Sequence, residues 1–331
     1  MAEEVFIHVG LQRCASTLIE HAFQAPDQPV SRELRDRRIL PLTDLHLFLR
    51  DRRADAFWTD AFVTEVRESY VLPVLEDENW RAAFLTEEGL SVTCLPDGPG
   101  IDVAARARHL KAMFDGLNVT VMLVVRDQVS FLRSLYALHL QNGGTSGFQD
   151  LADAIPDRAL NWCALADIYA EVFGREGICV VPYNAEAYAG GDPQVTGFLA
   201  AMQSVMGIEA PQDVPRNHLY NPGIKTADLP LQLAANRGLV PELAARVSDL
   251  VRSGVNKPFD ILQTIKGELG REQATEVRTA LNARTVDEMK AEAAPLSGAD
   301  ANSFLSRFEA GNRELCETYM PRYEASPFVV G

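Results

Sequence analysis

Short apolar runs separated by long amphipathic stretches are the main pattern along this chain. The runs are four to seven residues long, rich in Val, Ile and Leu, and carry no regular polar alternation, which predicts strands buried on both faces. Helical stretches between them are typical of parallel strands joined by crossover helices. The predicted strands are residues 5–9, 83–86, 119–125 and 178–182.

Apolar positions three and four residues apart predict helices over 60–76, 129–140 and 194–206. After about Pro222 the strand-like runs stop, and the pattern predicts successive helices up to Tyr319. The last, over 300–319, has one apolar stripe formed by Phe304, Phe308, Gly311, Leu315 and Tyr319. We therefore expect an α/β core over 1–225 and a helical C-terminal extension over 226–331, packed together as one structural unit.

The connection between the first two predicted strands is too long for a plain crossover. Its first part, residues 31–53, is rich in arginine and includes Arg32, Arg35, Arg37 and Arg38. A solvated face is the ordinary interpretation of such a cluster, and a lid or an acceptor-binding segment is the functional one. The chain as a whole carries a formal net charge of -15. Nucleic acids and anionic membranes need a basic face, so we expect neither as a partner.

Cysteine usage and the N-terminal sequence bear on the compartment. The 5 cysteines are odd in number and include no CxxC pair, so neither a disulfide framework nor a metal site is predicted. The chain opens with MAEEVFIHVG and shows no basic, apolar leader and no apolar run of membrane-spanning length. We expect a cytoplasmic protein, and the sequence leaves its oligomeric state open.

The stretch VFIHVGLQRCASTLI, residues 5–19, has the order strand, small-residue loop, helix. Backbone N–H groups of such a loop and the positive end of the following helix point at one place where an anion can bind. A nucleoside triphosphate loop would need GxxxxGK[ST], and the second Gly and the Lys are missing here; GxGxxG is absent too.

The loop resembles the 5′-phosphosulfate loop of sulfotransferases that use 3′-phosphoadenosine 5′-phosphosulfate (PAPS). In bacterial members this loop often has the sequence GxPKCAST, and here it is Gly10-Leu11-Gln12-Arg13-Cys14-Ala15-Ser16-Thr17. A second segment, VMLVVRDQVSFLRSLY, ends a predicted strand at Arg126 and has Ser134 eight residues later. It resembles the Arg and Ser with which these enzymes hold the 3′-phosphate. The RNHLYNP segment beginning at Arg216 is a looser match.

This resemblance implies a P-loop NTPase-like three-layer core, with a parallel sheet covered by helices on both faces. It also implies metal-independent transfer of a sulfuryl group from PAPS to a hydroxyl or amine of a small molecule or carbohydrate. Gly10, Cys14, Ala15, Ser16 and Thr17 would hold the 5′-phosphate, and Arg126, Ser134 and Arg216 would bind the rest of the nucleotide. Arg13 stands where the family has Lys; it keeps the positive charge but cannot donate a proton to the leaving phosphate.

A hydroxyl acceptor also needs a general base. Glu87 and Glu88 follow the second predicted strand, at the edge where open α/β sheets place catalytic groups. Glu88 matches a Glu of related bacterial proteins and is preferred, with His46 as the second choice; a solvated acidic pair is the structural alternative. Two other functions stay open, an ATP-dependent small-molecule kinase that requires Mg²⁺ and a non-catalytic nucleotide-binding protein.

Overall fold

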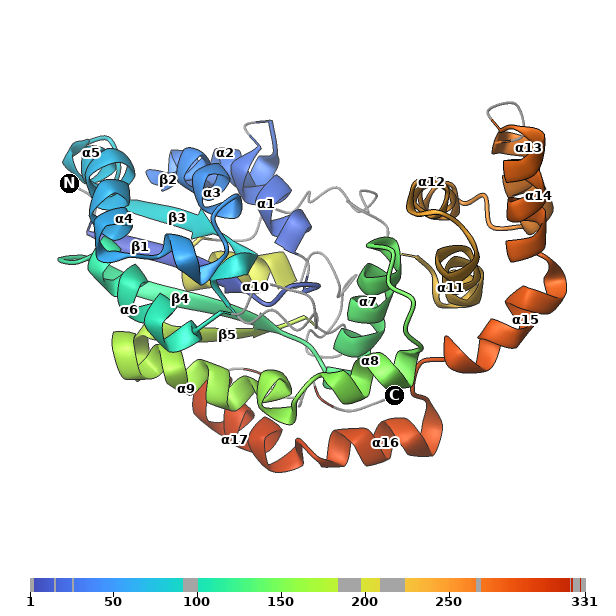
Figure 1. Cartoon of the computed structure of the whole chain (residues 1–331). Coiled ribbons are helices and arrows are strands. Elements are labelled where there is room, and N and C mark those ends of the chain that lie inside the picture. The colour runs from blue at the N-terminus through green and yellow to red at the C-terminus, as the bar shows by residue number, and fades with distance from the viewer. Residues whose placement is uncertain are drawn as a thin grey trace. The chain divides into compact units, whose positions relative to one another are not determined.

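A five-stranded, all-parallel sheet forms the centre of this α/β protein, with strand order β2-β3-β1-β4-β5. The computed structural model describes residues 3–14, 16–25, 27–91, 101–183, 198–208, 224–265, 269–321, 323 and 328. The four predicted strands are confirmed as parallel neighbours within two residues of their expected bounds (Figure 1). They are β1 (Glu4–Gly10), β3 (Ala82–Thr86), β4 (Asn118–Val125) and β5 (Ile178–Pro182).

The fifth strand, β2 (Ile39–Pro41), lies inside the arginine-rich segment and pairs with β3, from Ile39 opposite Ala82 to Pro41 opposite Phe84. Sequence analysis missed this strand because three residues are too few to show a periodic pattern, and arginines precede it. Its edge position tolerates Pro41, which lacks a backbone donor. The segment is therefore regular structure, with α2 (Pro29–Asp36) before the strand and α3 (Thr43–Arg50) after it.

Strand order and crossover handedness together distribute the helices over the sheet. Parallel connections are right-handed, and the connection from β1 to β2 runs toward the opposite edge from the other three. Its helices therefore cover one face, and those of the later crossovers cover the other. Figure 1 shows α6 (Val103–Met113) and α9 (Trp162–Phe173) in front of the sheet, and α10 (Phe198–Val205) behind it.

Two of the predicted helices are interrupted. The stretch 60–76 consists of α4 (Asp60–Val66), a π-helical turn (Arg67–Val71) and α5 (Leu72–Glu76), because Pro73 has no N–H for the regular ladder. The stretch 300–319 is divided into α16 (Gly298–Ser306) and α17 (Glu309–Tyr319). Four of the five residues of the predicted stripe are buried, so the amphipathic interpretation holds on both sides of the break.

The chain forms two compact units. The first comprises Met1–Gln128, Asp157–Tyr220 and Leu305–Gly331 and contains the sheet. The second comprises Val129–Pro156 and Asn221–Phe304, and its described part is helical. Its helices are α7 (Gln128–Gln141, from its second residue), α8 (Phe148–Ala154), α11 (Leu229–Gly238), α12 (Pro241–Arg252), α13 (Pro258–Ile265), α14 (Arg271–Ala280), α15 (Ala283–Glu292) and most of α16.

In the part of the chain that the structure describes, none of the helices combines the length and the apolar character needed to cross a membrane. A surface hollow lies at the edge of the sheet where the strands begin, lined by Glu3, Glu4, Arg38, Trp80, Arg81 and Asn118. Gly10, Glu87, Glu88 and Arg126 lie at the other edge, where the strands end.

Candidate functional site

Three loops meet at the carboxyl ends of the central strands. The connections after β1 and β4 leave in opposite directions. Open α/β sheets form their ligand-binding crevice at the point where neighbouring strands have this arrangement. Leu11 N–H donates to the Val124 carbonyl at 3.0 Å, and Glu87 N–H donates to the His8 carbonyl at 2.9 Å. The loop after β1 is therefore fixed to the end of β4, and the loop after β3 is fixed to β1.

Gly10 is required by the way these loops cross. Its φ is +117°, and a Cβ there would lie 2.5 Å from the Ser91 hydroxyl and 3.1 Å from the Glu88 carbonyl oxygen. Any larger residue would be strained and would push the β3 loop away. This glycine of the predicted phosphate loop thus permits a close approach of backbone to backbone.

Two of the predicted phosphate-binding donors already form hydrogen bonds within the loop. Cys14 N–H and the Ser16 hydroxyl both donate to the Leu11 carbonyl, each at 3.2 Å. Ser16 is buried, whereas Thr17, the second residue of α1 (Ser16–Gln24), is exposed. Ala15 lies outside the described residues. In this conformation the Thr17 hydroxyl is the more accessible of the two predicted side-chain donors.

Arg126, the first residue after β4, contacts the loop as its place in the sequence suggested. Its Nη1 donates to the Arg13 carbonyl at 3.2 Å, and Arg13 has a left-handed backbone, with φ 64°. Trp162 Nε1 donates to the Arg126 carbonyl at 2.9 Å, which holds the arginine backbone in place. The Nε of Arg126 is buried and has no hydrogen-bond partner in the described part of the chain.

The sequence also predicts Ser134 and Arg216 as nucleotide-binding residues. Ser134 lies half-buried in the middle of α7, in the second unit. Arg216 lies outside the described residues. Their predicted roles stay predictions.

Cys14 lies fully buried under the loop, with charges of both signs around it. Burial raises the pKa of its thiol to about 12; Glu88 and Asp127 act in the same direction, and Arg126 and Arg13 oppose them. The thiol is therefore neutral at physiological pH and contributes packing rather than a nucleophile.

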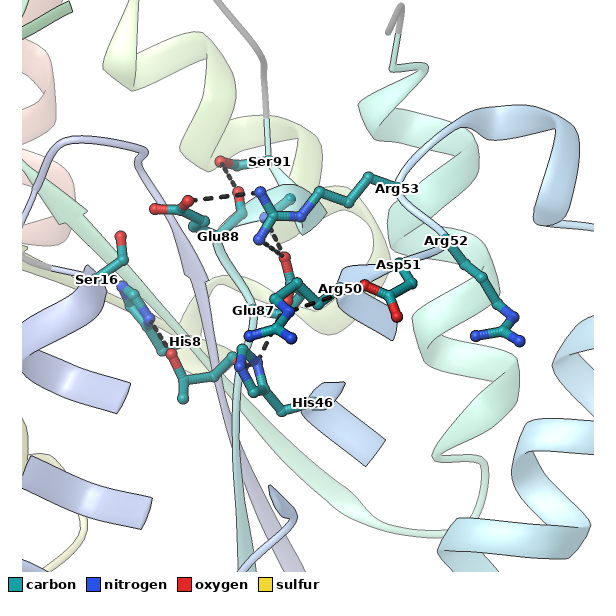
Figure 2. Close-up of polar contacts among 12 residues, drawn as sticks. His8, Ser16, His46, Arg50, Asp51, Arg52, Arg53, Glu87, Glu88 and Ser91 are labelled. Atoms are coloured by element: carbon teal, nitrogen blue, oxygen red, sulfur yellow. Dashed lines mark hydrogen bonds and ion pairs between the residues drawn. The ribbon is translucent and has the colours of Figure 1, made fainter. Parts of the chain in front are cut away.

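A second polar cluster lies at the end of β3 (Figure 2). Glu87 is 1% exposed, and three groups contact its carboxylate. Arg53 Nη2 and the Gly89 N–H both lie 2.8 Å from Oε1, and His46 Nδ1 lies 3.3 Å from Oε2. Among the described residues, the Glu88 carboxylate has only the longer contact with Arg53 Nη1, at 3.5 Å, and its side chain is 24% exposed. The preferred candidate base is thus the accessible one of the two carboxylates.

His46 is buried on α3, and its protonation follows from its neighbours. Its Nδ1 lies 2.6 Å from the Thr86 carbonyl and 3.3 Å from Glu87 Oε2, and because both are acceptors, Nδ1 carries a proton. Burial by itself would lower the pKa of His46, but the contact with Glu87 and the charge of Glu20 outweigh it and raise the pKa. The structure brings His46 to Glu87, the neighbour of the preferred Glu88.

Sequence analysis overlooked Glu20 and Arg53. Glu20 lies on α1, four residues after Ser16 and so on the same helix face; burial, together with Glu88 and Glu87, raises its pKa. The four-residue spacing from Ser16 is the signal in the sequence that points to Glu20. Arg53 comes from the connection between α3 and α4, and nothing in its local sequence distinguishes it from the other arginines there.

The fold and site define an α/β protein with a polar cluster and an arginine-bearing loop at the switch point of a parallel sheet. Comparisons with protein-family models, with curated proteins and with solved structures find no match for this chain.

Proposed function

We propose that this chain is a PAPS-dependent sulfotransferase with a P-loop-like core. The observation that carries the proposal is the contact between Arg126 and the Arg13 carbonyl, together with the buried, unpartnered Nε of Arg126. A guanidinium left with an unused buried donor beside an anion-binding type of loop suits a phosphate group, which accepts two parallel hydrogen bonds.

The residues fit a nucleotide with two separate phosphates better than a triphosphate. One cationic side chain follows β1, Arg13, and another follows β4, Arg126, so positive charge is available at two points of the sheet edge. The Thr17 hydroxyl at the start of α1 and the helix N-terminus would bind the 5′-phosphate. Arg126 would bind the 3′-phosphate, with Ser134 and Arg216 completing the set as predicted from the sequence.

In the proposed reaction the acceptor oxygen attacks the sulfur while the bond between the sulfur and the bridging phosphate oxygen breaks. The acceptor proton passes to the Glu88 carboxylate, and adenosine 3′,5′-bisphosphate leaves. Glu88 is suited to this role because its side chain is partly exposed, whereas His46, at 2% exposure, lies beneath it. Arg13 would stabilise the charge on the leaving oxygen without protonating it.

Calorimetry with adenosine 3′,5′-bisphosphate and with Mg²⁺-ATP tests the nucleotide. Tighter binding of the bisphosphate is expected, and replacing Arg126 by Ala should weaken it by roughly 2 to 4 kcal/mol. Arg158→Ala is the matched control, because Arg158 is an exposed arginine of the same unit. Tighter binding of ATP would support a kinase instead.

Transfer of labelled sulfate from PAPS to a panel of hydroxyl and amine acceptors tests the activity. Adenosine 3′,5′-bisphosphate binding without transfer to any acceptor would indicate a non-catalytic nucleotide-binding protein. Transfer that persists unchanged in Arg126→Ala would contradict the assigned role of that arginine.

A further inference from the structure

Arg53 lies over the turn that carries the two candidate carboxylates. Its guanidinium bridges them, with Nη2 at 2.8 Å from Glu87 Oε1 and Nη1 at 3.5 Å from Glu88 Oε1 (Figure 2). Its stem packs directly on Gly89, since a Cβ at that position would lie 2.6 Å from Arg53 Cδ and 2.7 Å from Cγ. A small residue at 89 is thus a condition for this arrangement.

The backbone that bears Arg53 is itself held by a buried arginine. Arg106 on α6 is 1% exposed; its Nη2 donates to the Arg53 carbonyl at 2.9 Å and to Asp55 Oδ1 at 2.5 Å. Its guanidinium also stacks on Trp58, 3.9 Å from the ring centroid, and Trp58 Nε1 donates to the Arg52 carbonyl at 2.8 Å. The segment therefore has little freedom to move Arg53 away from the β3 loop.

Glu87 and Glu88 are held in different ways by this arrangement. Both oxygens of the buried Glu87 face cationic or N–H groups, from Arg53 and Gly89 on one side and His46 on the other. Glu88 has one long contact to the same guanidinium and keeps an exposed part. Glu87 is thus an anchor for Arg53, and Glu88 is the carboxylate whose position Arg53 can adjust.

We propose that Arg53 is a positioning residue of the acceptor site, which is anchored to the buried Glu87 and holds the Glu88 carboxylate in place to take the acceptor proton. This inference rests on the proposed sulfotransferase function. Arg53 acts through Glu88 and takes no part in nucleotide binding, which separates its role from those of Arg13 and Arg126.

Arg53→Gln tests the proposal, with Arg50→Gln as the matched control. Arg50 ends α3, is half exposed and contacts only Asp51 at 3.9 Å among the described residues. In Arg53→Gln we expect kcat/KM for sulfuryl transfer to fall about 10- to 100-fold, mainly through kcat, with the bisphosphate affinity unchanged. Arg53→Lys should restore part of the rate, because its ammonium keeps a positive charge beside the two carboxylates.

Gly89→Ala provides a second variant that displaces Arg53 without removing its charge, and the same losses are expected. The titration of His46, followed by NMR, gives a readout that needs no acceptor: without Arg53, Glu87 should act on His46 alone and raise its measured pKa. Unchanged kcat and His46 titration in Arg53→Gln would overturn the inference. A rise in KM alone would also overturn it, because Arg53 would then bind the acceptor directly. Failure of the wild-type protein to bind the bisphosphate would instead refute the proposed function.

Discussion

His8 should make the first unit lose stability as the pH falls. The side chain lies in β1 with 0% exposure; its Nδ1 is 2.8 Å from Thr86 Oγ1, and its Nε2 has no partner in the described part of the chain. Burial, helped by the charge of His46, lowers its pKa from 6.5 to about 3. The folded protein therefore keeps His8 neutral between pH 6.5 and about 3, where the unfolded chain would protonate it.

The sign and size of the effect follow from this difference in pKa. Between pH 6.5 and about 3 the unfolded state binds a proton that the native state does not, so stability falls with pH in that window. Each pH unit below 6.5 costs about 1.4 kcal/mol, and lowering the pH from 7 to 5 should cost about 2 kcal/mol through His8. The raised pKa of His46 acts in the opposite direction, and it is present in the variants as well.

Urea unfolding at pH 7, 6 and 5 measures the effect. Trp58, Trp80 and Trp162 are the 3 tryptophans of the chain and all belong to the first unit with His8, so their fluorescence reports on the relevant unfolding. His8→Gln should lose about 2 kcal/mol less than the wild type between pH 7 and 5. His109→Gln, a half-buried histidine of the same unit, should behave as the wild type. Equal pH dependence in His8→Gln and the wild type would refute the assignment of a neutral, buried His8.

Three further outcomes follow from contacts in the first unit. Gly10→Ala should destabilise it by about 1 to 3 kcal/mol in urea unfolding, because the backbone is left-handed and the methyl group meets the Ser91 hydroxyl; an unchanged midpoint would contradict this. Asn312→Leu should cost about 1 to 3 kcal/mol, since it removes the donor to the buried Gln128 Oε1 and one of the two acceptors of its Nε2, and Gln128→Leu with Asn312→Leu should cost less than the sum of the two single changes. Cys14 should resist iodoacetamide at pH 8 in the native protein and react once urea unfolds it, as peptide mass spectrometry can check; rapid native labelling would contradict its raised pKa.

The strand ends could be predicted from the sequence because they depend on a short-range signal. Four continuous apolar runs mark β1, β3, β4 and β5, and the residues that follow parallel strands must meet at one edge. That is enough to bring Arg126 to the first loop and to place Glu87 and Glu88 nearby. The three-residue β2 gives no such signal, so the arginine-rich segment was interpreted as an insertion.

Arg53 could not be predicted because its role depends on packing between distant segments. Its contact with Glu87 needs the bare backbone of Gly89, and its backbone position needs Arg106 from α6 together with Trp58 from its own connection. None of these relations has a fixed spacing in the chain. The arginines of this segment differ in function only through what each one touches.

Glu87 and Glu88 are neighbours in the chain, but their side chains lie in different surroundings because of their positions relative to the end of β3. Side chains alternate along a strand, and Glu87 continues the extended backbone of β3 with φ -157° and ψ 105°, so it points away from Thr86. There its carboxylate accepts from Gly89 N–H and caps the 3-10 turn of Glu88–Leu90. The Gly89 N–H and Arg53 Nη2 both contact Oε1 at 2.8 Å, so the Glu87 carboxylate is held in place by buried contacts. Glu88 lies within the turn, and no backbone donor of the described residues contacts its carboxylate, so in the proposed reaction it is the carboxylate that meets the acceptor.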